Sequence, residues 1–342
     1  MHFHTPKATG VAYCCSRTYF RPLLCLTALL CLIHLLVYTP HSALCQDAGP
    51  AIRTVKALFF NRTDILSTRR LFAALVAGFR ASLSSHNFTV TDGIRVEIVK
   101  REATVDNLYN LAVNDLSKDN RIFVLTGIFG DVALQHVLPA IESHGVVAFA
   151  PFTGSSTLRK WNPHLYFTRA EPASELLALI RYAMNSLWVH RLGFMYLQNV
   201  SYGDLEFNHA REIIFTLGQN ISGVFTVKSS LSEPADDVVF NATWEAFADT
   251  RPQAVIVFGS PIKDTAKFIK RMLTDKRTAG AYLLGPLAVQ EMLLSVWREA
   301  VDAGVPFVSG QVITSGTNPL AKDTQYVAIQ RFQKDMEEYL RK

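Results

Sequence analysis

The feature that most constrains the fold of this chain is a regular alternation of short apolar blocks with amphipathic helical stretches. Blocks such as residues 146–149 and 254–258 are apolar at every position, which is typical of strands buried on both faces of a sheet. Stretches such as residues 68–85 and 263–274 repeat apolar side chains at helical spacing. Because nearly every pair of blocks is joined by one such stretch, the sequence predicts an α/β fold of doubly wound parallel sheets.

Two lobes suit the length of this pattern better than one large sheet. We predict lobe one over residues 46–170, lobe two over residues 171–313, and a return to lobe one over residues 314–342. The loops of each lobe should gather at the carboxyl ends of its strands, where open α/β sheets bind ligands.

Three local predictions accompany this division. Asp131 is expected to cap the helix that follows it, and residues 307–313 are expected to form the last strand. Trp161 reads as a surface turn with a buried indole ring.

Residues 1–45 have the pattern of a secretory leader. Lys7, Arg17 and Arg21 form a basic segment, and residues 23–38 form a largely apolar run. Small residues stand three and one positions before residue 46, as signal peptidase prefers. Cleavage and an uncleaved signal anchor both remain open. Either one predicts a protein of the secretory pathway that is secreted or held at the cell surface, with membrane contact only through this segment if it is uncleaved.

Charge and cysteine usage exclude several classes of function. All five cysteines lie within the first 45 residues, so the remaining 297 residues cannot use a thiol for catalysis or metal binding. Without the three cations of the leader, 31 basic residues face 29 acidic ones. This near-neutral balance gives no support to nucleic-acid binding or to a strongly basic membrane surface.

Five Asn-x-Ser/Thr motifs favour a glycosylated extracellular protein when they follow a signal peptide, although any one of them can arise by chance. The acceptor asparagines are Asn61, Asn87, Asn199, Asn220 and Asn241.

No motif for catalysis is visible. The chain has no glycine-rich nucleotide fingerprint, no P-loop, no G-x-S-x-G elbow and no H-E-x-x-H metal motif. An extracytoplasmic α/β enzyme with an unrecognised site therefore stays open only as an alternative to a binding protein.

Loops at the ends of predicted strands carry the candidate binding residues. The loop at 126–130 contains Gly127 and Phe129, and the loop at 151–156 contains the consecutive residues Thr153, Gly154, Ser155 and Ser156. Small residues let a ligand approach backbone N–H groups, and hydroxyls add donors for a carboxylate or another anion. The alternative is that Ser155, Ser156 and Thr157 only cap a turn.

Two further loops could face a ligand from the second lobe. Tyr202 could stack on a ligand or donate a hydrogen bond to it, or it could pack on its own helix. Ser260 follows another predicted strand, where a simple turn is the alternative reading.

Taken together, these segments resemble the extracellular part of the receptor-type adenylate cyclases of trypanosomatid parasites. The resemblance runs over about residues 52–342 and rests on the segments "VKALFF", "FVLTGIFG", "FTGSSTLRKWNPHLYFTRAEPASELLALIRY", "LGFMYLQNVSYGD", "AVIVFGSP" and "IKDTAKFIKRMLTDKRTAGAYLLGP".

That region of the family is similar to type I periplasmic binding proteins of the leucine/isoleucine/valine class. The resemblance implies two Rossmann-like lobes, three crossovers and a cleft that closes on a small polar ligand. Gly127, Thr153, Gly154 and Ser155 match the lobe-one positions that supply ligand donors, and Tyr202 matches the aromatic residue from lobe two. No acidic residue matches a partner for a ligand ammonium group, so amino-acid specificity is not implied.

The same resemblance implies what the full-length family adds. Its members are plasma-membrane receptors that continue through a membrane helix to a cyclase domain that uses Mg²⁺ and ATP. We therefore expect this chain to be a truncated or partial binding region, without cofactor or catalytic activity of its own, that can dimerise through this ectodomain. We also expect lobe one to lack closing elements and to expose an apolar patch. An inert product of a degenerate gene copy remains a further alternative.

Overall fold

The computed structural model describes residues 52–342, apart from residues 64–68, 92, 201–202, 231 and 317–318. Residues Ile52–Lys342 form one compact unit. The predictions about the leader and about Tyr202 fall outside the described residues.

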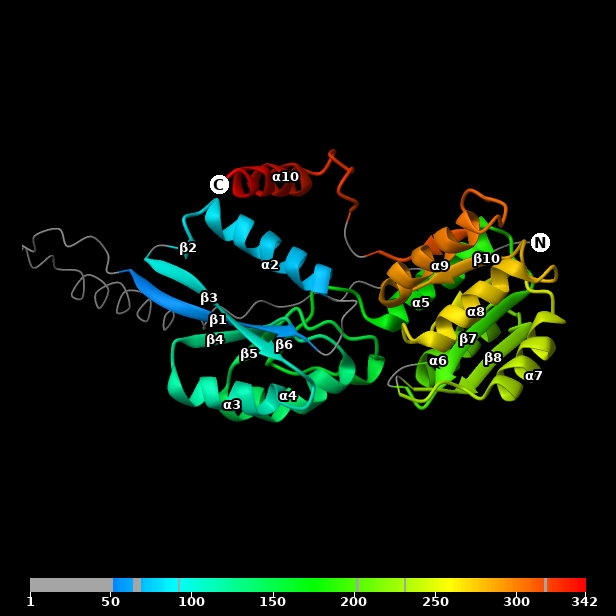
Figure 1. Cartoon of the computed structure of the whole chain (residues 1–342), viewed down its shortest axis with the longest axis horizontal. Coiled ribbons are helices and arrows are strands. Elements are labelled where there is room, and N and C mark those ends of the chain that lie inside the picture. The colour runs from blue at the N-terminus through cyan, green and yellow to red at the C-terminus, as the bar shows by residue number, and fades with distance from the viewer. Residues whose placement is uncertain (1–51, 64–68, 92, 201–202, 231, 317–318) are drawn as a thin grey trace, which may run out of the picture. The chain divides into compact units, whose positions relative to one another are not determined.

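The first sheet has six strands in the order β2-β3-β1-β4-β5-β6 (Figure 1). Its strands are β1 (Arg53–Arg62), β2 (Thr89–Thr91), β3 (Ile94–Ala103), β4 (Ile122–Thr126), β5 (Val147–Phe149) and β6 (Leu165–Tyr166). All neighbouring strands run parallel except β2, which pairs antiparallel with β3.

The second sheet has five parallel strands in the order β11-β10-β9-β7-β8. Its strands are β7 (Leu192–Gln198), β8 (Gly223–Lys228), β9 (Ala254–Val257), β10 (Tyr282–Gly285) and β11 (Val312–Thr314).

Helices connect almost all of these strands. The α-helices are α2 (Arg69–Ser84), α3 (Leu108–Lys118), α4 (Asp131–His144), α5 (Pro172–Arg181), α6 (Asp204–Thr216), α7 (Asp237–Ala248), α8 (Lys263–Thr274), α9 (Gln290–Asp302) and α10 (Val327–Leu340). Single turns of tighter or wider helix are η2 (Ser156–Leu158), η3 (Tyr182–Ser186) and η4 (Leu287–Val289). The prediction of an α/β fold with two parallel-type sheets is confirmed.

Each sheet has a core on both faces, which explains why its strands are continuous apolar runs. In β7, Met195 and Leu197 pack toward α7 and α8, whereas Phe194 and Tyr196 pack toward α5 and α6. In β1, Leu58 and Phe60 pack with side chains of α3 and α4, which lie together on one face of the first sheet in Figure 1. Phe59 contacts Phe72 of α2, edge to face at 6.2 Å between ring centroids.

Two local predictions are wrong in this part of the fold, and one strand was not predicted. The last strand, β11, begins at Val312 and not at residue 307, and the preceding residues 307 and 308 are exposed. The three-residue strand β2 was not predicted, because so short a segment has no measurable periodicity. Trp161 does not bury its indole ring and is 88 % exposed.

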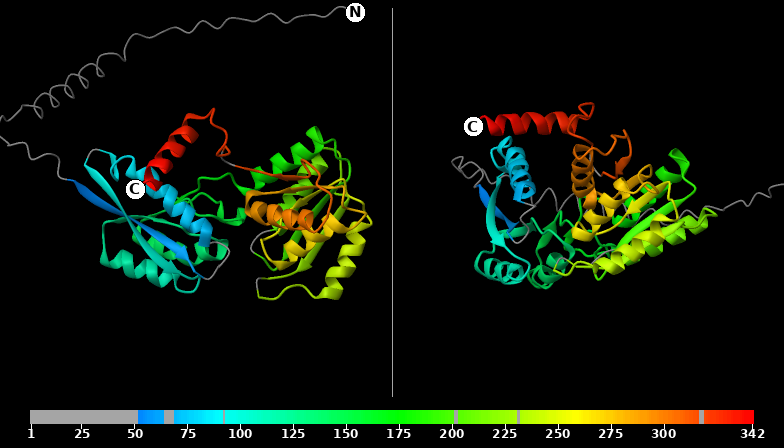
Figure 2. Two further views of the ribbon diagram at one scale, coloured as in Figure 1. Left: turned by 45° about the horizontal axis from the view of Figure 1, so that its top comes forward. Right: turned by 45° about the vertical axis from the view of Figure 1, so that its right-hand side comes forward.

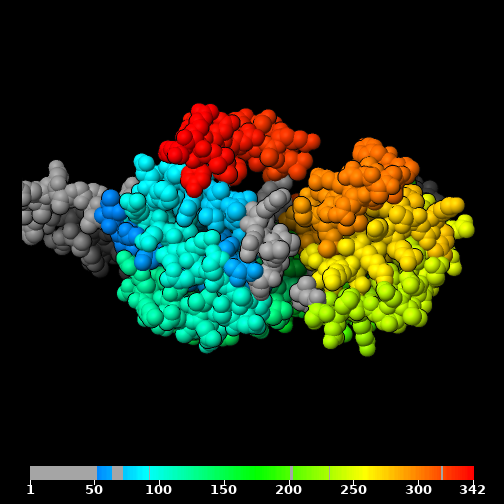
Figure 3. All heavy atoms as spheres, in the orientation of Figure 1, coloured from blue at the N-terminus to red at the C-terminus, as the bar shows by residue number. Residues whose placement is uncertain are grey.

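The C-terminal helix α10 packs against α2 of the first sheet (Figures 2 and 3). Two polar contacts hold it there: Ser85 Oγ donates to Asp335 Oδ2 at 3.0 Å, and Arg331 Nη2 lies 2.6 Å from His86 Nε2. Phe332 lies against Gly78 of α2. Within the described part of the chain, every helix is too short or too polar to cross a membrane.

The carboxylate of Asp275, directly after α8, is held by several hydrogen-bond donors. Asp275 accepts hydrogen bonds from Arg277 Nε (3.0 Å), Arg277 Nη2 (2.6 Å), the Arg277 backbone N–H (2.9 Å) and Trp244 Nε1 (3.1 Å). The hydrogen bonds from the Arg277 side chain lower the pKa of Asp275 well below its usual range.

We predict that Asp275→Asn lowers the free energy of unfolding at pH 7 by about 1–2 kcal/mol, because charge-assisted hydrogen bonds are lost. Since the folded-state pKa is depressed, this stabilisation is fully present above the unfolded pKa of about 3.9 and is lost as the pH falls toward the folded value. Urea denaturation at pH 7 and pH 3 should show the difference from the wild type shrinking in acid. Asp237→Asn, which breaks an exposed pair with Lys267, is the control and should change little.

Candidate functional site

The loops that follow β4 and β5 continue the first sheet beyond its strands. Phe129 and Phe152 form a parallel bridge, and their rings stack at 4.7 Å with 1° between the ring planes. Gly127 has a φ of +75°, and a Cβ atom there would lie 2.4 Å from the Phe60 carbonyl oxygen. Phe129 therefore helps to join the two loops, and Gly127 lies against the backbone of β1.

The backbone donors of residues 154–157 are already occupied. Asp131 Oδ1 accepts from the N–H groups of Gly154 (3.0 Å) and Ser155 (3.1 Å). The prediction that Asp131 caps α4 is thus wrong, since Gly130 holds the cap position and the Asp131 side chain turns to the neighbouring loop. An anion seeking these two N–H groups would have to displace a buried carboxylate.

Glu206 occupies the next donor in the same loop. Its Oε1 accepts from the Ser156 N–H at 3.1 Å, and its Oε2 accepts from the Gly203 N–H at 2.8 Å at the start of α6. Glu206 is fully buried. One carboxylate therefore joins the loop after β5 in the first sheet to the helix after β7 in the second sheet.

The hydroxyl side chains of this loop are less accessible than the sequence suggests. Thr153 is fully buried and Ser155 is 2 % exposed. Ser155 Oγ accepts from the Thr157 N–H at 3.1 Å and lies 2.6 Å from Thr157 Oγ1. Ser155 therefore caps the η2 turn, as the alternative reading of the loop allowed.

Four polar atoms in the same stretch are buried without a protein partner. They are Thr153 Oγ1, Ser156 Oγ, Arg159 Nε and Arg159 Nη2. Burial, together with the nearby Arg169 cation, lowers the pKa of Arg159 to about 10, which leaves its guanidinium charged at neutral pH. Buried polar groups are normally satisfied, so this concentration of free donors marks a candidate binding site.

A buried ion pair between Arg169 and Glu175 is hydrogen-bonded to this stretch of the chain. Arg169 Nη2 and Nε donate to Glu175 Oε1 at 2.5 and 3.1 Å, and Arg169 Nη1 donates to the Thr153 carbonyl oxygen at 2.8 Å. Glu175 Oε2 accepts from the Leu287 N–H (2.9 Å) and from Ser315 Oγ (2.8 Å). The pair thus connects the candidate site to the start of α5, to the end of β10 and to the segment after β11.

Ser260 lies at the end of β9 in a turn. Its carbonyl oxygen accepts from Thr265 Oγ1 (2.6 Å) and from the Ile262 N–H (2.8 Å). The backbone of Ser260 thus holds the segment that leads into α8, and its role toward a ligand stays a prediction.

The sequence reasoning missed Arg159, Glu206 and the Arg169–Glu175 pair. Glu206 stands three residues after Gly203, the spacing of a capping box, but glycine at the first position makes that signal weak. Arg159 stands three residues after the run of small residues 153–156 and directly before Lys160, and nothing local shows that it is buried. Within the described residues, no group of three or more His, Cys, Asp or Glu side chains could hold a metal ion.

Comparison with known proteins gives the relatives of this chain. A family model described as the adenylate cyclase, periplasmic binding protein-like domain matches residues 174–316. Receptor-type adenylate cyclase ESAG 4 of Trypanosoma brucei brucei is 41 % identical over 97 % of this chain, and GRESAG 4.1 of the same organism is 33 % identical over 98 %. The chain is homologous to trypanosomatid receptor-type adenylate cyclases over nearly its whole length. It spans about a quarter of these relatives, 27 % and 26 % of their lengths.

Solved structures confirm the fold of this cyclase homologue. An extracellular ligand-binding receptor from Verminephrobacter eiseniae superposes with a TM-score of 0.67 at 18 % identity, covering 84 % of this chain and 78 % of that one. A solute-binding protein from R. palustris, in complex with 4-hydroxybenzoate, gives 0.65 at 13 % identity, covering 84 % and 74 %. The two sheets are therefore those of a periplasmic-binding-protein-like fold.

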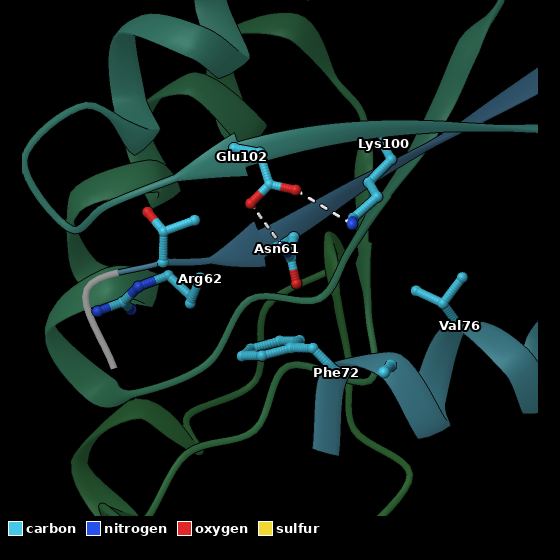
Figure 4. Close-up of a pocket in the computed structure, with 8 residues that line it drawn as sticks. Asn61, Arg62, Phe72, Val76, Lys100 and Glu102 are labelled. Carbon is cyan, nitrogen blue, oxygen red and sulfur yellow. Dashed lines mark hydrogen bonds and ion pairs between the residues drawn. The ribbon is translucent and has the colours of Figure 1, made fainter. Parts of the chain in front are cut away.

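The acceptor asparagines of the cyclase homologue differ in their surroundings. Asn61 lies within β1, and its Nδ2 donates to Glu102 Oε2 at 2.6 Å, beside a pocket of about 380 Å³ (Figure 4). Asn87, Asn199 and Asn220 are exposed in connecting segments. Asn241 is exposed on α7, where its Oδ1 accepts from Arg271 Nη2 at 2.9 Å.

We predict unequal glycan occupancy when the chain is secreted from a eukaryotic host. A glycan attached to Asn61 Nδ2 would disturb the contact with Glu102 and would have to project from within a strand. Asn87 and Asn220 lie exposed in connecting segments, so neither obstacle applies to them. Glycopeptide mass spectrometry should find Asn87 and Asn220 occupied to a greater extent than Asn61. Equal occupancy at all three would contradict this reading of the site.

We also predict that Glu206→Ala lowers the free energy of unfolding by about 1–3 kcal/mol, because the Ser156 and Gly203 N–H groups lose their acceptor. Glu212→Ala, at an exposed position on the same helix, is the matched control and should have little effect. Guanidinium denaturation of the two variants in parallel measures the difference. An equal loss in both variants would mean that removal of a negative charge from α6, and not loss of the two bridging hydrogen bonds, is responsible.

Proposed function

We propose that this chain carries the extracellular ligand-binding region of a receptor-type adenylate cyclase. In this proposal a small polar ligand binds at the loop formed by residues 153–159, and its binding regulates cyclic AMP production by the full-length receptor. The observation that carries the proposal is the set of four buried polar atoms without a protein partner in this loop, in a fold shared with ligand-binding proteins.

The proposal includes the division of the chain into two lobes. Lobe one would contain residues 46–170, lobe two residues 171–313, and residues 314–342 would return to lobe one. The packing of α10 on α2 and the separate cores of the two sheets support this division. Glu206 would then be a contact between lobes that is made when the lobes are closed.

Ser156 offers the clearest test by mutation. Its hydroxyl has no protein partner, so Ser156→Ala should leave the melting temperature unchanged while lowering ligand affinity roughly ten- to hundredfold. Ser155→Ala is the matched control, because it removes the acceptor of the Thr157 N–H and should lower the melting temperature. Isothermal titration calorimetry and thermal denaturation separate the two effects.

The ligand itself is found by a thermal-shift screen of the secreted chain. The screen should contain small carboxylates, including 4-hydroxybenzoate, together with neutral amides, sugars and nucleosides. A compound that binds the native state raises the melting temperature with its concentration. If no compound raises it, or if Ser156→Ala binds every compound as well as the wild type does, the proposed site is wrong.

A further inference from the structure

The unpartnered edge of Arg159 has the geometry that this protein uses elsewhere to hold a carboxylate. In a guanidinium group, the Nε–H and one terminal N–H point the same way and can donate together to a carboxylate. Four other arginines use this Nε–Nη2 edge on an aspartate or glutamate: Arg101 on Asp115, Arg121 on Asp119, Arg169 on Glu175 and Arg277 on Asp275. In Arg159 the same edge is buried and has no protein acceptor.

The guanidinium of Arg159 is held in place by its other contacts. Nη1 donates to the Arg169 carbonyl oxygen at 3.2 Å, and Arg159 Cζ lies 3.9 Å from the centroid of the Phe167 ring. A fixed orientation reduces the entropy lost when an acceptor binds. The free edge is therefore preorganised for a planar anion.

Three nearby carboxylates, those of Glu175, Glu206 and Asp131, accept from other donors, and the charge of a fourth, Glu171, acts on Arg159 without a hydrogen bond to its Nε or Nη2. Both oxygens of Glu175 are held by Arg169, Leu287 and Ser315, and both oxygens of Glu206 accept from backbone N–H groups. Asp131 accepts from Gly154 and Ser155. A partner for the Arg159 edge therefore has to come from outside this set.

The free hydroxyls of the loop lie close to Arg159 along the hydrogen-bond network. Arg169 donates to the Thr153 carbonyl oxygen and accepts from Arg159 through its own carbonyl oxygen, so it connects both residues. The Arg159 N–H donates to the Ser156 carbonyl oxygen at 3.1 Å and closes the turn. Thr153 Oγ1 and Ser156 Oγ, which have no protein partner, thus belong to the same hydrogen-bonded loop as the Arg159 edge.

Arg159 also lines a pocket of about 320 Å³, which is at the lower end of the range for ligand sites. Its other walls include Lys160, Trp161, Tyr166 and Phe167. Trp161 and Tyr166 are 88 % and 56 % exposed, so their rings are available to cover an apolar body. Cations beside aromatic rings fit a molecule that joins a carboxylate to a ring.

We propose that the Nε–Nη2 edge of Arg159 receives the carboxylate of a small aromatic acid, whose ring packs in the adjoining pocket. The inference rests on the proposed ligand-binding function and names the class of ligand. Arg159 Nε and Nη2 are buried in this structure. The acid can therefore reach them only when the loop of residues 153–159 opens.

The test compares 4-hydroxybenzoate with 4-hydroxybenzamide, which differ only in the group presented to Arg159. We expect the acid to bind the full wild-type chain at least about tenfold more tightly than the amide. The amide is uncharged and has one oxygen, so it cannot accept the two parallel charge-assisted hydrogen bonds that a carboxylate accepts from arginine. Arg159→Met should lower the affinity for the acid about 10- to 100-fold and leave that for the amide unchanged. Lys118→Met removes an exposed charge at the end of α3, away from the pocket, and should change the affinity less than about threefold.

A second measurement separates a binding role from a structural one. The ligand-free Arg159→Met variant should melt at the wild-type temperature or above it, because it no longer buries a cation with an unpartnered edge. Arg159→Lys keeps the positive charge but cannot donate two parallel hydrogen bonds to one carboxylate, and it should bind the acid as weakly as Arg159→Met does.

Several results would overturn the inference. Equal wild-type affinity for the acid and the amide would overturn it. Equal losses of affinity in Arg159→Met and Lys118→Met would also overturn it, since net charge would then explain the binding. If sugars or neutral amides raise the melting temperature and carboxylates do not, the carboxylate site is wrong while the proposed function stands. If no compound in the screen raises it, both fail together.

Discussion

The Arg169–Glu175 ion pair is the interaction on which the arrangement of the loops after β5, β10 and β11 depends. The side chains are 6 % and 2 % exposed, and their remaining hydrogen bonds reach Thr153, Leu287 and Ser315. A buried pair contributes little net stability when compared with apolar packing, but loss of one partner leaves an uncompensated charge and costs about 3–5 kcal/mol. Its main effect is therefore to fix where three distant segments of the chain meet.

Around that pair, the protein satisfies its own backbone donors with its own carboxylates. Asp131 and Glu206 together accept from three consecutive N–H groups, those of residues 154, 155 and 156. The loop therefore has the donors of an anion site, but internal carboxylates fill the main-chain part of it. What remains for a ligand is a set of side-chain groups, namely the hydroxyls of Thr153 and Ser156 and the edge of Arg159.

The alternating pattern of the sequence was sufficient to predict both sheets, because strands buried on two faces leave unbroken apolar runs such as β7. Helix α8 matches its predicted bounds, Lys263–Thr274, since its apolar spacing is regular. The hydrogen bonds of Asp131 were not predictable, because its acceptor role depends on a loop 23 residues away. The same is true of Arg159, whose burial depends on Phe167 and Arg169.

In the proposed receptor, Glu206 would distinguish a closed state from an open one. Its two hydrogen bonds join Ser156 after the first sheet's β5 to Gly203 after the second sheet's β7, so they exist only while these segments are together. A ligand shifts that equilibrium only by its extra affinity for one state. A carboxylate on Arg159 would add an acceptor on the same side as Ser156 without competing for the Ser156 N–H. Ligand and Glu206 would then stabilise the closed arrangement together, each through donors that the other does not use.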